Sequence, residues 1–212
     1  MIVLASCDIS YFRDHYESFY FSAKSCGYEP HINIINPDDE ILNSNIENVT
    51  YSYGPNSKVF YSINRFLIAE NYIKNGVLVT DIDCIFNEKM QEPKEDIGLF
   101  LRKNNPNHMK VAAGIVWLNN TKNAKIFIDK VKNYLYNSKQ VWFVDQLALY
   151  RAYLDTKSNL SCFEFSQMHM DWEFIDSSLM WTGKGNRKFN NLLYKEKKEE
   201  YSGRFKSKRR SR

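Results

Sequence analysis

The sequence is poor in the residues that mark several classes of protein. It has 8 glycines and 5 prolines in 212 residues, too few for a collagen-like, linker-dominated or many-turned all-β chain. Its 4 cysteines lie far apart with no CxxC pair, which excludes a cysteine metal cluster or redox motif, and we expect them to be reduced thiols. No apolar segment approaches the ~18 residues of a membrane-spanning helix, and no leader segment is recognisable. These absences predict a soluble, cytoplasmic protein.

What the sequence has is enough apolar surface for a folded core and an uneven distribution of charge. The hydrophobic fraction is 43% and the aromatic fraction 15%, which excludes a disordered chain. Six of the 29 Lys and Arg fall in the last ten residues, so residues 1–202 keep 23 cations against 25 acidic side chains. We therefore expect one domain over 1–202 and a basic, disordered tail over 203–212. The domain has no basic stripe, which argues against nucleic acid as a partner.

Two interpretations of the basic tail stay open. Runs of like charge at a chain end are usually solvated and disordered. A second interpretation is peripheral contact with an anionic membrane or polymer, to which each cation near the surface adds up to ~1 kcal/mol.

Apolar runs of strand length alternate with segments of helical periodicity along the chain. Alternation of this kind predicts an α/β, Rossmann-like three-layer sandwich with a mostly parallel central sheet. The predicted strands cover 2–6, 31–35, 49–53, 77–80, 97–101, 111–118, 160–165 and 179–181; the predicted helices cover 11–26, 57–74, 121–135, 145–154 and 187–200.

Acidic side chains follow two of the predicted strands. Asp8 follows the first strand, and Asp81 and Asp83 follow the buried run VLVT at 77–80. In an open α/β sheet, ligands bind outside the carboxyl ends of the strands, and residues i and i+2 of an extended segment face the same way. Asp81 and Asp83 could therefore hold one Mn²⁺ or Mg²⁺ ion, whose preference for oxygen ligands suits a diphosphate.

The segment from Arg65 to VLVTDIDCIF resembles the helix and DxD strand of GT-A-fold glycosyltransferases, most of all those of glycosyltransferase family 8. The resemblance extends over most of the chain. It implies a metal-dependent hexosyltransferase that moves a sugar from a nucleotide-diphosphate donor, UDP-hexose by resemblance, to a glycan, lipid or protein acceptor. The family mechanism would retain the configuration at the anomeric carbon.

The N-terminal half of the chain carries the residues that match the family's donor site. Asp8, Ser10 and Tyr11 match a pattern that holds the uracil base by hydrogen bonding and ring stacking. Arg65 matches an arginine that contacts the donor sugar and phosphate, although it could instead snorkel or pair with Glu70.

Three further segments resemble the family in the C-terminal half. VAAGIVWLNNT resembles a strand that retains Gly114, and TGKGNRK resembles an HxxGxxK loop in which Gly185 and Lys188 would hold the diphosphate. FVDQLAL resembles a helix start whose Asp145 and Gln146 would face the reacting side of the donor sugar as the catalytic pair. Asp145 could equally be an N-terminal acid that stabilises its helix through the dipole.

The sequence departs from the family at two positions. An asparagine expected to bind the sugar is Ala112, and the histidine that would be the third metal ligand is Thr182. A hydroxyl is a much weaker ligand for this ion, so His169 and Asp171 are the candidates to replace it.

Two alternatives remain beside the transferase interpretation. A haloacid-dehalogenase-like phosphatase also ends an apolar strand with Asp-x-Asp and would use Asp81 as its nucleophile, but that family places the motif in its first strand. A nucleotide-sugar-binding domain without catalysis would account for Ala112 and Thr182.

Overall fold

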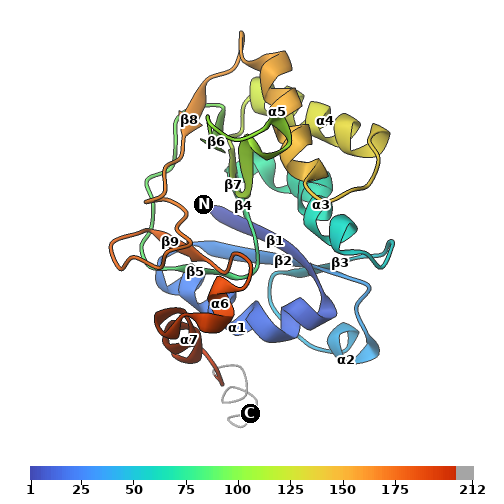
Figure 1. Cartoon of the computed structure of the whole chain (residues 1–212). Coiled ribbons are helices and arrows are strands. Elements are labelled where there is room, and N and C mark those ends of the chain that lie inside the picture. The colour runs from blue at the N-terminus through green and yellow to red at the C-terminus, as the bar shows by residue number, and fades with distance from the viewer. Residues whose placement is uncertain (204–212) are drawn as a thin grey trace.

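The structure is a computed structural model that describes residues 1–203, and its centre is one seven-stranded sheet (Figure 1). The strand order is β3-β2-β1-β4-β7-β6-β8. Neighbours pair in parallel except at β4/β7 and β6/β7, so the expected mostly parallel α/β sandwich is confirmed. The strands are β1 (Ile2–Asp8), β2 (Glu29–Ile35), β3 (Val49–Ser52), β4 (Val77–Thr80), β6 (Ile97–Leu101), β7 (Val111–Leu118) and β8 (Cys162–Glu164).

Helices cover both faces of this sheet. Successive residues of each strand point to opposite faces, so a strand that is apolar throughout contributes to a core on each side. In β4, Val77 and Val79 face one core and Leu78 faces the other. The first core includes α3 (Lys58–Ile68), α4 (Lys122–Asn137) and α5 (Val144–Thr156), and the second includes α1 (Ile9–Ser25).

A two-stranded antiparallel sheet of β5 (Cys84–Phe86) and β9 (Met180–Thr182) extends the second face. Beside it lie α6 (Arg187–Asn190) and α7 (Leu192–Glu199). Tyr194 of α7 packs with Ile85, Phe174 and Trp181 in a small third core. The last quarter of the described chain is thereby attached next to Asp83, which directly precedes β5.

Two predicted helices are interrupted in the structure. The segment predicted as a helix over 57–74 leaves the α conformation after Ile68 and continues as the 3-10 helix η1 (Ala69–Asn75). The segment predicted as a helix over 187–200 breaks at Asn191, whose extended backbone lets its side chain accept a hydrogen bond from the Tyr194 amide and cap α7. Apolar spacing cannot distinguish these cases, because both parts of each segment bury one face.

The structure also contains short elements that were not predicted. They are α2 (Asp39–Leu42), the 3-10 helix η2 (Asn107–Met109) and β5. All four cysteines are free thiols, as predicted. Among residues 1–203, no helix combines the length and the apolar character needed to cross a membrane. The predicted basic tail lies outside these residues apart from Gly203, so the domain boundary stays a prediction.

Candidate active site

The predicted acidic residues meet at one edge of the sheet. β1 and β4 are parallel neighbours, so Asp8 at the end of β1 and Asp81 just after β4 lie at the same edge. Gly114 of the antiparallel strand β7 lies against Asp81: a Cβ atom at Gly114 would be 2.8 Å from Oδ2 of Asp81. Glycine at this position therefore makes room for the Asp81 carboxylate.

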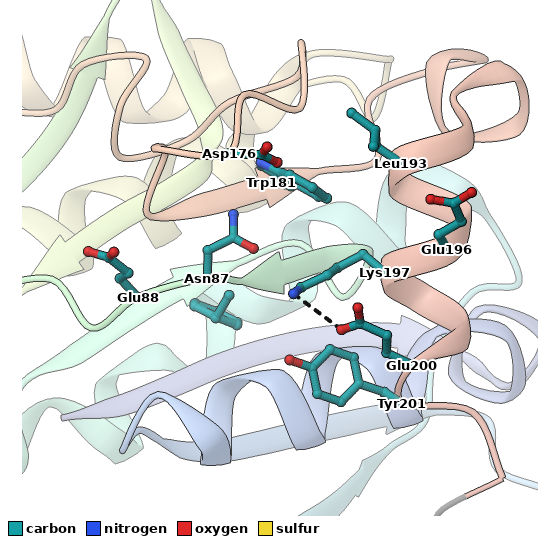
Figure 2. Close-up of a pocket in the computed structure, with 10 residues that line it drawn as sticks. Asn87, Glu88, Asp176, Trp181, Leu193, Glu196, Lys197, Glu200 and Tyr201 are labelled. Atoms are coloured by element: carbon teal, nitrogen blue, oxygen red, sulfur yellow. Dashed lines mark ion pairs between the residues drawn. The ribbon is translucent and has the colours of Figure 1, made fainter.

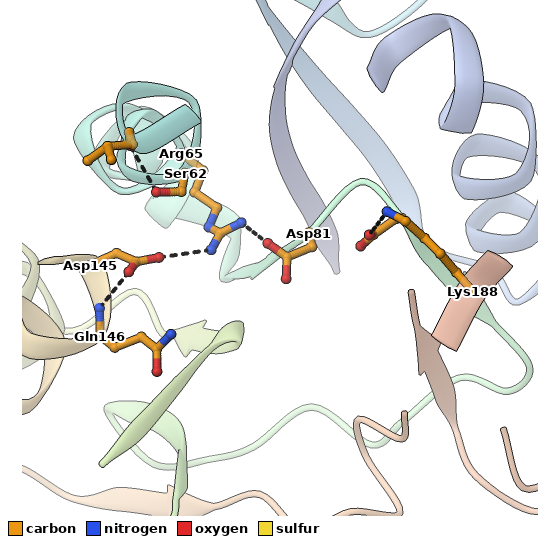
Figure 3. A network of polar contacts seen from close by, with 8 residues as sticks. Ser62, Arg65, Asp81, Asp145, Gln146 and Lys188 are labelled. Atoms are coloured by element: carbon orange, nitrogen blue, oxygen red, sulfur yellow. Dashed lines mark hydrogen bonds and ion pairs between the residues drawn. The ribbon is translucent and has the colours of Figure 1, made fainter. Parts of the chain in front are cut away.

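Arg65 lies between two carboxylates that come from different elements (Figure 3). From α3, its Nη1 donates to Oδ1 of Asp81, and its Nη2 lies 3.4 Å from Oδ2 of Asp145 on α5. Arg65 is only 4% exposed and Asp145 only 6%. The ion pair with Glu70 that the sequence allowed does not form; Glu70 pairs with Lys132 instead. The three residues, called here the Arg65 cluster, carry one positive and two negative charges.

Burial and charge act against each other in the Arg65 cluster. Burial alone would lower the pKa of Arg65, but Asp81 and Asp145 outweigh burial and raise it above its ordinary value. Burial raises the pKa of Asp145, and Arg65 opposes that rise. The arginine therefore stays charged and holds both carboxylates in fixed positions.

Lys188 forms a second ion pair close by. From α6, its Nζ donates to Oδ2 of Asp83 at 2.8 Å and to the Tyr11 hydroxyl oxygen at 3.1 Å. The same Nζ lies 4.7 Å from the centroid of the Tyr11 ring, within the range of a cation–π contact. Burial would lower the pKa of Lys188, but Asp83 outweighs burial and raises it. We call Tyr11, Asp83 and Lys188 the Lys188 cluster.

Two residues of the C-terminal quarter fix the position of the Lys188 cluster. Gly183 leaves room for it, since a Cβ atom there would lie 2.9 Å from Cδ of Lys188 and 3.0 Å from Oδ2 of Asp83. The Tyr194 hydroxyl donates to the Asp83 carbonyl oxygen at 2.8 Å, and the Gly183 amide donates to the same oxygen at 3.1 Å. Asp83 is thus held through its backbone as well as its side chain.

The predicted base-binding residues lie at the start of α1. Asp8 caps this helix, because its Oδ1 accepts a hydrogen bond from the Tyr11 amide at 2.8 Å. Ser10 is exposed on the first turn, and the Tyr11 side chain is 41% exposed. One ring face of Tyr11 is in contact with Lys188, and its ring centroid lies 5.3 Å from that of the buried His15.

Gln146 and Gly185 occupy the remaining predicted positions. Gln146 follows Asp145 on α5, and its Oε1 accepts a hydrogen bond from Nη2 of Arg102. Gly185 has a φ angle of +63°, in the left-handed region, and a Cβ atom there would meet nothing within 4 Å. The backbone at Gly185 is therefore open to a ligand.

Arg102 and Lys184 are two further cations near the site, and Arg102 was not singled out from the sequence. Burial lowers the pKa of Arg102, and Asp145 opposes this change. Burial lowers the pKa of Lys184, and repulsion from Arg102 and Arg187 lowers it further. The Lys184 ammonium lies 4.5 Å from the centroid of the Trp172 ring. No sequence motif indicated Arg102, because its contact with Gln146 depends on where β6 ends in the fold. The glycines on either side of Lys184 indicated the loop that contains it.

The two candidates for a third metal ligand make their hydrogen bonds within their own loop. The Asp171 carboxylate is fully buried and accepts hydrogen bonds from the Glu173 and Ile175 amides within its own loop. His169 contacts its own loop through Ser166. Thr182 is buried at 3% exposure. Within residues 1–203, no group of three His, Cys, Asp or Glu side chains could hold a metal ion.

Asp81 and Asp83 nevertheless fit a divalent ion that takes its other ligands from a bound molecule. One oxygen of each carboxylate is bonded to a cation, whereas the structure gives Oδ2 of Asp81 and Oδ1 of Asp83 no hydrogen bond among the described residues. Oxygen donors of this kind suit Mn²⁺ and Mg²⁺. Together the two clusters carry a net charge of −1, which favours an added cation.

A hollow of about 420 Å³ lies elsewhere, between the β5–β9 sheet and α7 (Figure 2). Four of its ten lining residues are acidic, and Lys197 pairs with Glu200 at 3.2 Å within it. None of the predicted site residues lines this hollow, so it is not part of the candidate active site.

Comparisons with known proteins address the fold. No protein-family model matches the sequence, and no curated protein matches it. Among solved structures, the glycosyltransferase GlyE of Streptococcus pneumoniae TIGR4, in its apo form, is similar over 95% of this chain and 60% of its own, with a TM-score of 0.65 and 16% identity. This chain therefore spans about 60% of the length of GlyE.

Two other solved structures are similar over nearly their whole length. A glycosyltransferase involved in glycosylation of the major capsid of PBCV-1 is covered to 98%, and this chain to 94%, with a TM-score of 0.61 and 12% identity. The galactosyltransferase LgtC, in complex with donor and acceptor sugar analogs, is covered to 96%, and this chain to 95%, with a TM-score of 0.57 and 12% identity. The chain therefore has the GT-A-like fold of glycosyltransferases, as its resemblance to that group implied.

Proposed function

We propose that this protein transfers a hexose from a UDP-sugar donor to a glycan, lipid or protein acceptor. The observation that carries the proposal is the convergence of the Arg65 and Lys188 clusters at the carboxyl ends of β1 and β4, on a fold that glycosyltransferases share. This edge of an α/β sheet is where such folds bind their ligands. A scaffold domain would have no need for two buried cations paired with the carboxylates of Asp81 and Asp83.

The Lys188 cluster is suited to hold the nucleotide and its diphosphate. Tyr11 offers a partly exposed ring for the base, and Asp8 keeps its second oxygen for a hydrogen bond to it. Lys188 would leave Asp83 in part to pair with phosphate oxygens, and the open backbone at Gly185 lets a phosphate approach.

Asp81 and Asp83 would hold Mn²⁺ or Mg²⁺ against the diphosphate, with the donor supplying further ligands. When bound, such an ion stabilises the negative charge that develops on the leaving diphosphate. Arg65, which is always charged, keeps Asp81 pointing toward that position and stabilises the same charge.

Asp145 and Gln146 would line the reacting face of the donor sugar. Asp145 is tied to Arg65 at 3.4 Å, so its position is coupled to that of Asp81, and Gln146 is held by Arg102. Two fixed polar groups beside the anomeric carbon can orient the sugar and stabilise its developing positive charge. By the resemblance to glycosyltransferase family 8, we expect the configuration at that carbon to be retained.

The proposal is tested with UDP-glucose and UDP-galactose in the presence of Mn²⁺. Calorimetry should detect binding to the wild-type protein, and release of UDP should fall when EDTA is added. The double variant Asp81→Asn/Asp83→Asn should lose affinity by about tenfold or more, since both metal ligands become neutral. The control is Asp129→Asn, a loss of one charge at an exposed position on α4.

Failure of the wild type to bind any nucleotide sugar, or unchanged binding and turnover in the double variant, would refute the proposal. A covalent aspartyl-phosphate at Asp81 would support the phosphatase alternative. Tight donor binding without hydrolysis or transfer to any acceptor would support the non-catalytic alternative.

A further inference from the structure

A second hollow, of about 260 Å³, lies between α5 and the turn that joins β6 to β7. We call it the basic hollow, because four cations and no acidic side chain line it: Arg102, Lys103, Lys110 and Lys157. Two tyrosines of α5, Tyr150 and Tyr153, line the same space.

The charges of the basic hollow are mostly uncompensated. Lys103 is 3.1 Å from Glu164, which stands outside the lining. Lys110 donates to the Lys103 carbonyl oxygen, and the structure gives Lys157 no ion pair within residues 1–203. With Glu164 counted, three positive charges remain around one small space. Like charges that line one space repel, and an anion that enters the hollow relieves the repulsion.

Arg102 connects the basic hollow to the candidate active site. Its Nη2 donates to Oε1 of Gln146 and, at 3.2 Å, to the Val111 carbonyl oxygen, and neither acceptor carries a formal charge. Its Nε is buried without a hydrogen-bond partner. Burial lowers the pKa of this arginine, which agrees with a charge that the protein leaves under-compensated. A ligand in the hollow would thus share a residue with the helix start that faces the donor sugar.

The two tyrosines give the hollow a character beyond that of an anion site. Tyr150 and Tyr153 are partly buried and line the space, so the hollow has aromatic as well as cationic walls. Aromatic faces bind the apolar faces of sugar rings, while polar groups around them fix orientation.

We propose that the basic hollow binds the acceptor, and that the acceptor is a sugar carrying a phosphate or carboxylate group. This proposal rests on the proposed function, because it places the acceptor beside the Gln146 end of the donor site. It names the chemical class of a substrate that neither the fold nor the donor site specifies.

The test is amide NMR of the full chain titrated with glucose 6-phosphate, glucuronic acid, methyl glucoside and inorganic phosphate. The two charged sugars should shift the amides of Leu101, Lys110 and Tyr153, and the neutral sugar should not; their relative affinities distinguish phosphate from carboxylate. Lys110→Gln/Lys157→Gln should weaken charged-sugar binding by about tenfold, since two cations are removed. Lys122→Gln/Lys125→Gln, the same charge loss on the exposed side of α4, should stay within about twofold of wild type.

Titration with UDP-glucose and Mn²⁺ separates this proposal from the proposed function. Donor-induced shifts around Tyr11 and Lys188 without any charged-sugar shift at the basic hollow would overturn the acceptor proposal and leave the proposed function intact. Equal binding of inorganic phosphate and glucose 6-phosphate would overturn the assignment to a sugar. Charged-sugar binding with no donor binding would overturn the acceptor role together with the proposed function.

Discussion

The Arg65 and Lys188 clusters are alike in containing a single cation but are built by different parts of the fold. Each brings a cation to one carboxylate of the Asp81–Asp83 pair. Arg65 comes from an 11-residue helix packed on the sheet and binds two carboxylates. Lys188 comes from a four-residue helix and binds one carboxylate and a tyrosine hydroxyl.

This difference indicates that the two halves of the site have different tasks. The Arg65 cluster belongs to the main sandwich, and its loss should lower the free energy of unfolding. The Lys188 cluster is attached through α6 and the glycine-containing loop before it, so its lysine can exchange Asp83 for a ligand. A rigid half and an adaptable half would together bind a charged donor that enters and leaves.

Replacing each cation by methionine gives the largest expected effect and tests the comparison directly. Arg65→Met leaves Asp81 and the buried Asp145 without a cation, and we expect the free energy of unfolding to fall by about 3 kcal/mol. Lys188→Met leaves only Asp83 unpaired, and we expect a loss of about 1 kcal/mol. Urea denaturation measures both values.

A double-mutant cycle supplies the control for that experiment. With Asp145→Asn already in place, Arg65→Met should cost less, because one of its two carboxylates is neutral. Equal losses for Arg65→Met and Lys188→Met would contradict the division into a rigid and an adaptable half.

His15 makes the Lys188 side sensitive to acid. It is 4% exposed, and burial, reinforced by Lys198 and Lys188 and opposed by Asp14, lowers its pKa to about 3. The folded chain therefore resists protonation where the unfolded chain accepts a proton near pH 6.5. Stability should fall as pH drops below about 6.5, by about 2 kcal/mol at pH 5, and the loss should continue until about pH 3.

The variant His15→Phe should remove most of this slope between pH 6.5 and 5, as followed by urea denaturation at several pH values. His108→Phe, at an exposed position of η2, is the matched control and should keep the wild-type slope. A slope that survives His15→Phe would mean that another group carries the acid sensitivity.

One glycine lies against each cluster, Gly114 against Asp81 and Gly183 against Lys188, so the same change to alanine can be compared on both sides. In Gly114→Ala the new carbon would meet Oδ2 of Asp81 at 2.8 Å, a group already fixed by Arg65, and we expect about 2 kcal/mol of destabilisation. In Gly183→Ala it would meet Cδ of Lys188 at 2.9 Å, part of a flexible side chain, and we expect about 1 kcal/mol. Thermal unfolding measures both losses of stability. A larger loss for Gly183→Ala than for Gly114→Ala would contradict the assignment of the Arg65 cluster to the rigid half.

The sequence predicted the sheet well because its central strands β1, β4 and β7 are buried on both faces. Continuous apolar runs located β6 and β7 at their observed bounds and placed Asp81 and Asp83 just after β4. Strand direction could not be predicted in this way, since an apolar run is the same in either direction. The antiparallel course of β7, which brings Gly114 to Asp81, emerged only in the structure.

The partners of the charged residues were harder to predict than their positions. Spacing along one helix suggested Glu70 for Arg65, whereas the observed partners lie 16 and 80 residues away in the sequence. Burial excluded Asp171 as a metal ligand for the same reason: its loop folds around its carboxylate. Tertiary pairing decided the case of Arg65, and the local conformation of one loop decided that of Asp171; residue spacing alone indicates neither.

The bond between Lys188 and Tyr11 joins residues 177 positions apart. Arg65, Asp81 and Asp145 all precede residue 146, so a growing chain can complete that cluster while its last quarter is still being synthesised. Domains generally begin to fold from the N-terminal side during translation. Until Lys188 has left the ribosome, the nascent site contains Asp81 and Asp83 without their second cation, so the proposed diphosphate site is completed after the Arg65 cluster.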